Sequence, residues 1–375
     1  MYADAAAATP LSPAARRELL RLLPLYGNPS ALHHEAVEAK KELERARTSV
    51  AESIGAHPDE IVFTASATQA NQLAVQIGFQ KGSALTSAVE HPSVLQPLRR
   101  RGLPVVELPV DHQGLVEVKK LEERITEDTS FVSIQLVNSE VGAIQPVRDV
   151  AKILRHYKGR SFATTKDRPL HIHTDASQAP LWMDIKVERL GVDLLTLDGQ
   201  KIGGPKGVGC LYIKRGLLIE PVLEDLQSGT ENVAQAGSFA VALAEAQAGV
   251  AERVSKILQV RNYLLEEIQR LVPGAVLNGP GLKGEYRVAN NINVSIPGLN
   301  ADMAVLAMDA QGIAISTRSA CTTNDEEPSH VIKALGVVPE LAGTAIRITL
   351  LPGATVPQAR RIAQTLAEIA KRYKQ

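Results

Sequence analysis

The stretch that decides the fold reads Asp198-Gly199-Gln200-Lys201-Ile202-Gly203-Gly204-Pro205-Lys206-Gly207-Val208-Gly209. The apolar run before it, residues 194–197, is typical of a buried strand, and the glycines after Lys201 are typical of a loop. A second short apolar run, residues 170–174, ends at Asp175. An amine and a carboxylate at two strand ends suit a pyridine aldehyde, since the lysine forms a Schiff base and the carboxylate pairs with the ring nitrogen. The pair predicts pyridoxal phosphate bound at Lys201.

Short apolar runs alternate with amphipathic segments over most of the chain. Strands are expected at residues 61–64, 83–88, 105–108, 131–137, 170–174, 194–197 and 209–213. Helices are expected at residues 30–54, 68–78, 94–101, 116–125, 146–157 and 239–270. This order predicts an α/β fold with a mostly parallel seven-stranded sheet, in which ligands bind at the carboxyl ends of the strands.

The pattern changes after about residue 270. A strand at residues 290–296, a helix at 301–311, a strand at 345–350 and a helix at 356–372 predict a smaller C-terminal α/β domain. The expected division is a large cofactor-binding domain, residues 12–250, and a small domain built from residues 1–11 and 251–375.

Charge and cysteine content argue against several classes of protein. Lys plus Arg and Asp plus Glu both number 41, so no net field favours nucleic acid or an anionic membrane. We interpret Arg99-Arg100-Arg101 as a solvated helix end rather than a basic patch. The two cysteines, Cys210 and Cys321, give neither a disulfide framework nor a metal-ligand spacing. With no secretory signal and no apolar run of 18 residues, a cytoplasmic protein without a membrane span is expected.

Three further motifs carry candidate chemistry. Ala65-Ser66-Ala67-Thr68 joins a strand to a helix, and a helix N-terminus suits a phosphate; the alternative is that Ser66 or Thr68 merely caps the helix. His91 follows another strand and would stack on a flat ring, relay protons, or be a hydrogen-bonded structural histidine. Cys321 lies among small and polar residues, where an accessible thiolate is a nucleophile, whereas Cys210 is expected in the core.

Taken in order, these motifs resemble the cysteine desulfurases of the nitrogen-fixation and iron–sulfur-assembly branch. These are fold-type I pyridoxal-phosphate enzymes of the class-V aminotransferase group. The matching motifs are Asp4 through Pro10, Gly27-Asn28-Pro29-Ser30-Ala31-Leu32-His33, Phe63 through Thr68, Glu90-His91, His173-Thr174-Asp175-Ala176-Ser177-Gln178, Lys201 with its glycine loop, Ser228-Gly229-Thr230, and Ser319-Ala320-Cys321 with Glu327-Pro328-Ser329-His330.

The resemblance implies a role for each matching residue. Lys201 would hold the cofactor and move protons, and Cys321 would attack the sulfur of bound L-cysteine, leaving alanine and a persulfide. The other cofactor contacts would be Ala67, Thr68, His91, Ser139, Asp175, Gln178, Asp198 and Gln200, with Thr230 reaching the phosphate from the other subunit. Asn28 would contact the substrate. The resemblance also implies a homodimer, and a scaffold or other acceptor protein that takes the sulfur.

Several of these positions depart from the family pattern. Asp198 replaces a phosphate-binding serine, Gln200 replaces a histidine, and Ser139 replaces an asparagine. Leu350-Leu351-Pro352 stands where the substrate-clamping arginine is expected, so this cation is predicted to be lost. Arg318 replaces a glycine, and our hypothesis is that it supplies the missing charge; the alternative is that it points to solvent or crosses the dimer interface.

Three functions follow from this combination. The first is an active cysteine desulfurase, which explains why lysine and cysteine are both present. The second is a weak or inactive dimeric partner or regulator, which the altered site favours. The third is another pyridoxal-phosphate reaction, a transamination or lyase reaction, in which Cys321 would have no evident part.

Overall fold

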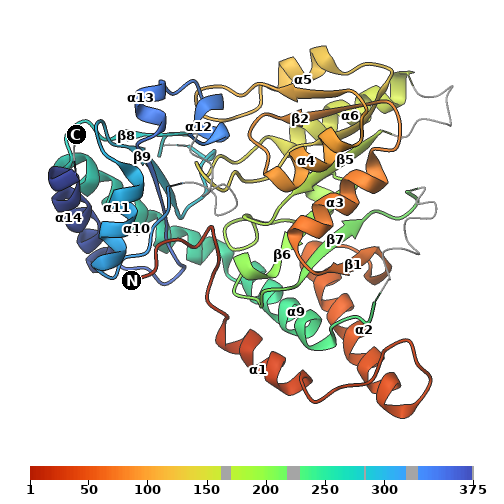
Figure 1. The fold of residues 1–375 in the computed structure, drawn as a ribbon. Helices are drawn as coiled ribbons and strands as arrows, with labels where there is room; N and C mark the ends of the chain where they lie inside the picture. Colours follow the sequence, from red (N-terminus) through yellow and green to blue (C-terminus); the bar gives the residue numbers. More distant parts are fainter. Residues whose placement is uncertain (162–169, 218–228, 283, 318–327, 374–375) are drawn as a thin grey trace.

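The fold centres on a seven-stranded sheet (Figure 1). The structure is a computed structural model that describes residues 1–161, 170–217, 229–282, 284–317 and 328–373. The sheet order is β1-β7-β6-β5-β4-β2-β3, with β1 (Ile61–Thr64), β2 (Ser83–Ser87), β3 (Val105–Leu108), β4 (Thr129–Ser133), β5 (His171–Asp175), β6 (Leu194–Asp198) and β7 (Gly209–Ile213). β7 runs antiparallel to both neighbours and the other pairs are parallel. The predicted α/β fold with a mostly parallel seven-stranded sheet is confirmed.

Apolar side chains cover both faces of this sheet. Side chains alternate along a strand, so Leu194 packs into the cluster around α3 (Ala67–Gly78) while Leu195 packs into the larger core on the other face. The other helices around the sheet are α4 (Pro92–Arg100), α5 (Val118–Arg124), α6 (Val147–Ser161) and α7 (Val187–Leu190). This two-sided burial explains why the strands read as continuous apolar runs.

The predicted strand at 131–137 was placed too late in the sequence, because β4 ends at Ser133. Residues 134–137 stay buried and continue to bond to the neighbouring strand: the Ile134 amide donates to the His173 carbonyl at 3.1 Å. Their apolar pattern therefore reflects burial beyond the end of the strand.

Two helices differ from the prediction. The segment expected as one helix at 239–270 forms α9 (Val233–Gln247) and α10 (Val250–Leu271), because Gly249 between them adopts a left-handed conformation with φ 65°. Helix α1 (Pro13–Leu22) was not predicted, although Ser12 and Pro13 are a typical start. The Ser12 hydroxyl caps it by accepting from the Ala15 amide at 3.1 Å. Helices α1 and α2 (His34–Ile54) pack on α9 at one end of the molecule (Figure 1).

The C-terminal part forms a second, antiparallel sheet ordered β10-β9-β8. Its strands are β8 (Val276–Leu277), β9 (Asn291–Ser295) and β10 (Ala345–Thr349), and its helices are α11 (Ala301–Ala310), α12 (His330–Ala334), α13 (Pro339–Ala342) and α14 (Val356–Tyr373). The first residues of the chain join this part: the Ala3 amide donates to the Ala314 carbonyl at 2.9 Å and the Ala5 amide to the Thr349 carbonyl at 3.1 Å. The domain boundaries at 12–250, 1–11 and 251–375 stay a prediction.

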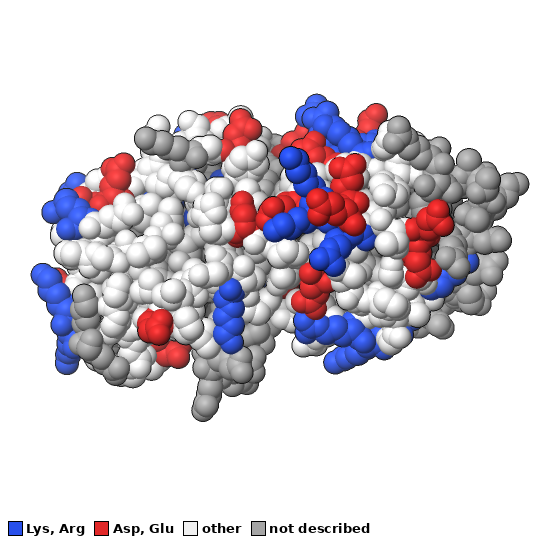
Figure 2. Space-filling model, turned by 90° about the horizontal axis from the view of Figure 1, so that it is seen from above, with Lys and Arg blue, Asp and Glu red and all other residues white. Residues whose placement is uncertain are grey.

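The charged side chains on the face shown in Figure 2 are intermixed, with acidic and basic groups side by side. Arg99, which we interpreted as part of a solvated helix end, lies near the end of α4 with its side chain exposed and pairs with Glu107 at 2.6 Å. In the part of the chain that the structure describes, no helix is both long enough and apolar enough to cross a membrane.

Candidate active site

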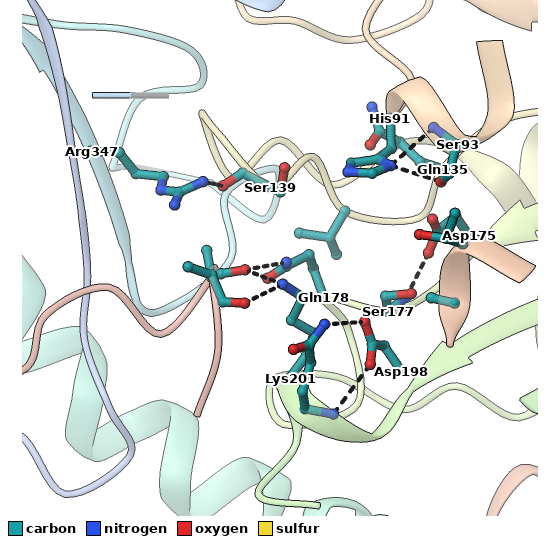
Figure 3. A pocket seen from close by; sticks show the side chains of 16 residues that line it. His91, Ser93, Gln135, Ser139, Asp175, Ser177, Gln178, Asp198, Lys201 and Arg347 are labelled. Atoms are coloured by element: carbon teal, nitrogen blue, oxygen red, sulfur yellow. Dashed lines mark hydrogen bonds between the residues drawn. The ribbon is translucent and has the colours of Figure 1, made fainter. Parts of the chain in front are cut away.

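A pocket lies at the carboxyl ends of β5 and β6 (Figure 3). These strands are parallel, so Asp175 at the end of β5 and Lys201 just after β6 reach the same edge of the sheet. Predicted residues that line the pocket are Ala67, Thr68, His91, Ser139, Asp175, Gln178, Asp198, Gln200 and Lys201. Ala6, Ala7 and Ser177 also line it, from motifs quoted above for the resemblance, and the lining residues not predicted are Ser93, Gln135, Val137 and Arg347.

The amine of Lys201 lies against the N-terminal segment of the chain. Its Nζ donates to the carbonyl of Ala6 at 2.8 Å and to the carbonyl of Ala7. Gln178 Nε2 donates to the same Ala6 carbonyl at 2.9 Å. Residues near the start of the chain thus form the wall that holds the lysine amine in the pocket.

The carboxylate of Asp175 is held from two sides. Its Oδ1 accepts from the Ser177 amide at 2.9 Å, and its Oδ2 accepts from Asn71 Nδ2 at 2.7 Å. Asn71, on α3, is fully buried, also donates to Ser93 Oγ at 2.9 Å, and its Oδ1 has no hydrogen-bond partner among the described residues. Asn71 was not among the predicted site residues. The available signal was a polar side chain about one turn after Thr68, in a helix whose other buried residues are alanine, valine, isoleucine and glycine.

His91 both caps a helix and lines the pocket. Its Nδ1 lies 2.7 Å from Ser93 Oγ and accepts from the Ser93 amide at 3.1 Å, which starts α4. Burial lowers the pKa of His91, and the nearby charges of Lys201 and His330 lower it further, against the opposing effect of Asp175. The imidazole is therefore a neutral flat ring at neutral pH. His91 is a hydrogen-bonded structural histidine and at the same time part of the pocket wall.

The N-terminus of α3 faces the same pocket through Ala67 and Thr68. Ser66, not Thr68, caps this helix, because Ser66 Oγ accepts from the Gln69 amide at 3.2 Å. The amides of the first helical turn have no partner within the helix, so they can donate to an anion. Gly209 lets β7 approach this turn, since a Cβ there would lie 2.8 Å from the Ala67 nitrogen.

Asp198 and Gln200 lie beside this helix N-terminus. Asp198 is buried, and its two carboxyl oxygens accept from the Gln200 amide and from Gln200 Nε2, both at 3.2 Å. Burial raises the pKa of the Asp198 carboxyl, and the positive charge of Lys201 and the bonds from Gln200 lower it by less.

An arginine lines the pocket although positions 350–352, where the substrate-clamping arginine was expected, hold none. Position 352 is proline, but Arg347, on β10, is almost fully buried and lines the pocket opposite Asp175 (Figure 3). Its Nη2 pairs with Asp4 Oδ1 at 2.7 Å and its Nη1 donates to the Ser139 carbonyl at 3.2 Å. Its Nε has no hydrogen-bond partner among the described residues. The pocket wall therefore contains a guanidinium whose Nε donor is not used by the described residues.

Two predicted residues, Asn28 and Thr230, lie away from this pocket. Thr230 lines a separate hollow with Phe63 and Gln69, and Asn28 Nδ2 donates to its Oγ1 at 3.5 Å, so a single chain does not bring either to the Lys201 pocket. Cys321 and Arg318 lie outside the described residues, and the roles predicted for them stay predictions.

Comparison with known proteins points to one family. The family described as aminotransferase class-V matches residues 1–224 and 219–359. The chain is 36% identical to cysteine desulfurase IscS of Dictyoglomus turgidum over 93% of its length and 89% of that protein. It is 35% identical to the mitochondrial cysteine desulfurase of Drosophila melanogaster, covering 92% of this chain and 76% of the relative.

Solved structures agree with the sequence comparisons. A NifS-like protein, 31% identical, superimposes with a TM-score of 0.87 over 99% of both chains. A NifS-like protein from Rickettsia africae, 26% identical, also gives 0.87 over 99% of both chains. A structure described as SspA in complex with cysteine, 29% identical, gives 0.76 over 94% of this chain and 99% of the other.

Proposed function

Since the chain belongs to the class-V aminotransferase family, as one of its pyridoxal-phosphate-dependent cysteine desulfurases, we propose that the Lys201 pocket is its active site and that Cys321 receives the sulfur. The observation that carries this assignment is the convergence of the Lys201 amine, the Asp175 carboxylate and the N-terminus of α3 on one pocket. Against the alternative of an inactive partner stands Arg347, which lines the pocket and which we propose as the cation that binds the substrate carboxylate.

The described residues fit the cofactor part by part. The Lys201 amine suits the aldehyde, and the Asp175 carboxylate, fixed by Asn71, suits a protonated pyridine nitrogen. Asn71 Oδ1, buried without a partner among the described residues, marks the same end of the pocket as polar. The neutral ring of His91 suits stacking on an aromatic face, and the α3 amides suit a phosphate. Bound there, the cofactor supplies the electron sink that weakens the bonds to the Cα of an amino acid.

The residues of the chain do the remaining work. Lys201 Nζ moves a proton at the substrate Cα, because it is the amine that reaches the reacting end of the pocket. The Cys321 thiolate attacks the substrate sulfur, forming an S–S bond while the substrate C–S bond breaks. The electron pair of the broken bond stays with the carbon, which takes up a proton and becomes the methyl group of alanine. The enzyme is left with a Cys321 persulfide, so atoms and electrons balance.

Both chain segments that flank residues 318–327 are anchored beside the pocket, which supports this role for Cys321. Before it, the backbones of Ser316 and Arg347 exchange hydrogen bonds of 3.1 and 2.7 Å. After it, Ser329 Oγ donates to Glu140 Oε2 at 2.5 Å, next to Ser139. His330 Nε2 lies 3.0 Å from the carbonyl of Glu90, the neighbour of His91.

Arg347 is the proposed partner of the substrate carboxylate. Replacing Arg347 with methionine is expected to weaken L-cysteine binding by about 10- to 100-fold, the effect of losing a charge-assisted hydrogen bond. Cysteamine, which is cysteine without the carboxylate, should bind the variant as it binds the wild type. Spectral titration of the cofactor-loaded protein with both ligands gives the two affinities. Equal losses for both ligands would assign Arg347 a purely structural role through Asp4.

We further propose a homodimer in which Thr230 of one chain completes the pocket of the other. The support is an apolar surface on α1 and the loop after it, with exposed fractions of 56% at Leu20, 59% at Leu23, 82% at Tyr26 and 97% at Leu32. Asn28 of this loop hydrogen-bonds Thr230, so the apolar surface and Thr230 lie together. Large exposed apolar groups of this kind mark a protein interface, and a second copy would cover them.

The dimer is testable by sedimentation. The wild type is expected to sediment as two chains, and the double change Tyr26→Lys and Leu32→Lys as one chain that also binds the cofactor less tightly. Val338→Lys, at a position 52% exposed in the C-terminal part, is the matched control and should stay dimeric. A double variant that remains a dimer with unchanged cofactor affinity would sink the proposed interface.

The remaining parts of the proposal concern the fate of the sulfur. The Cys321 persulfide is proposed to pass its outer sulfur to an acceptor protein for iron–sulfur cluster or thio-cofactor assembly, in the cytoplasm. The names of the relatives support transfer of the sulfur for iron–sulfur cluster assembly. The free, buried thiol of Cys210 suits a reducing compartment such as the cytoplasm. The test follows labelled sulfur from cysteine in the presence of a candidate acceptor protein. Label that stays on Cys321 and does not reach the acceptor would count against this route.

A further inference from the structure

Asp198 poses a problem at the phosphate end of the pocket. It lies opposite Gly209 in the β6–β7 ladder, and Gly209 abuts the first turn of α3 so closely that a Cβ would lie 2.7 Å from the Ser66 carbonyl carbon. Asp198 therefore stands next to the α3 amides, and it lines the same pocket as Ala67 and Thr68. A phosphate monoester bound there carries nearly two negative charges at neutral pH, and an ionised Asp198 would repel it.

The surroundings of Asp198 limit how this repulsion can be avoided. The side chain cannot turn away into water, because it is 6% exposed and its oxygens are fixed by two hydrogen bonds from Gln200. Gln200 is neutral, so it adds no charge to the site. Lys201, the nearby cation, is committed to the cofactor aldehyde. Ala67 and Thr68 on α3 and Gly209 on β7 carry no charge, and Asp175 on β5 adds a second negative one.

We propose that Asp198 binds the phosphate of the cofactor as a neutral carboxylic acid, donating a hydrogen bond to it, so that cofactor binding weakens as pH rises and this proton is lost. The inference rests on the assignment of the pocket to pyridoxal phosphate. The raised pKa of the buried carboxyl agrees with it. Loss of the proton turns a hydrogen bond into a repulsion between like charges in a buried site, a change that costs about tenfold or more in affinity.

The test compares pyridoxal phosphate with pyridoxal, which lacks the phosphate but forms the same bond to Lys201. Equilibrium dialysis of the cofactor-free protein at a series of pH values from ~5 to ~8.5, which covers the range in which a carboxyl with a raised pKa loses its proton, gives the preference for the phosphorylated form. The preference is the ratio of the dissociation constants of pyridoxal and pyridoxal phosphate, so effects of pH on the lysine amine cancel in it. For the wild type, the preference is expected to fall about tenfold from the lowest to the highest pH. For Asp198→Asn, which keeps the acceptor oxygen for the Gln200 amide, it should not fall.

Two further variants make the result decisive. Asp198→Ser should behave like Asp198→Asn, since neither side chain ionises. Asp175→Asn, on the neighbouring strand of the same pocket, should weaken both ligands alike but keep the fall of the preference with pH, because Asp198 is still present. The proposal is overturned if the wild-type preference does not change with pH, or if Asp198→Asn strengthens both ligands equally. The readout is cofactor binding, so it does not depend on whether the protein desulfurates cysteine. A protein that desulfurates cysteine but shows no change of preference with pH would disprove only the role of Asp198.

Discussion

Lys201→Ala is expected to abolish conversion of L-cysteine to alanine and to remove the visible absorbance of the Schiff base. The amine reaches the pocket from the turn after β6 and is held there by the carbonyls of Ala6 and Ala7. No other lysine lines this pocket among the described residues, so nothing can replace it. Loss of a positioned proton-transfer group alone lowers rates by about 10²- to 10⁴-fold, and the covalent attachment is lost as well. Absorbance spectra and alanine analysis measure both effects.

The matched control is Lys206→Ala, in the same glycine-rich loop. Lys206 is exposed and does not line the pocket. This variant should keep its colour and its rate. Appreciable turnover in Lys201→Ala, with the cofactor present, would show that the pocket has been assigned wrongly.

Cys321→Ala is expected to stop sulfur transfer while leaving the cofactor bound. The variant should keep the visible band of the wild type and still respond spectrally to L-cysteine, because Lys201, Asp175 and Arg347 are untouched. Without a nucleophile for the substrate sulfur, the C–S bond is not broken, so alanine formation should fall by a factor comparable to that for the lysine variant. Trapping of persulfide with an alkylating reagent, followed by mass analysis, measures the product on the wild type.

Cys210→Ala provides the control for this experiment. Cys210 lies fully buried in β7, and burial raises the pKa of its thiol to about 12, so it is not a nucleophile at neutral pH. Its removal should leave desulfuration unchanged. Sustained turnover in Cys321→Ala would instead favour the alternative of a different reaction on an amino acid.

The fold and the cofactor end of the pocket could be read from the sequence because their signals are local. Alternating apolar and amphipathic segments placed the strands, and Asp175 and Lys201 at strand ends placed the site at one edge of the sheet. Gly249 divided a predicted helix in two because one residue with positive φ is enough to redirect a chain whose apolar pattern continues across it.

The substrate end could not be read in this way, because it is built by tertiary contacts. Arg347 was not predicted, because it lies three to five residues before positions 350–352, where an arginine was expected. It lies inside a strand and shares a face with Thr349, whose Oγ1 accepts from the Ala6 amide, so both side chains meet the N-terminal segment. Asn71 is recognisable only once its partner Asp175 lies beside it. Thr230 lies in another hollow of the same chain, and a role at the cofactor depends on a second copy.

The central claim is that L-cysteine loses its sulfur in the Lys201 pocket and leaves as alanine. Chromatographic analysis of the carbon product formed by the purified, cofactor-loaded protein from L-cysteine with a thiol reductant tests this most directly. The account predicts one alanine for each sulfide released and no pyruvate. Pyruvate and ammonia in place of alanine, or no carbon product from a protein that carries bound cofactor, would contradict it.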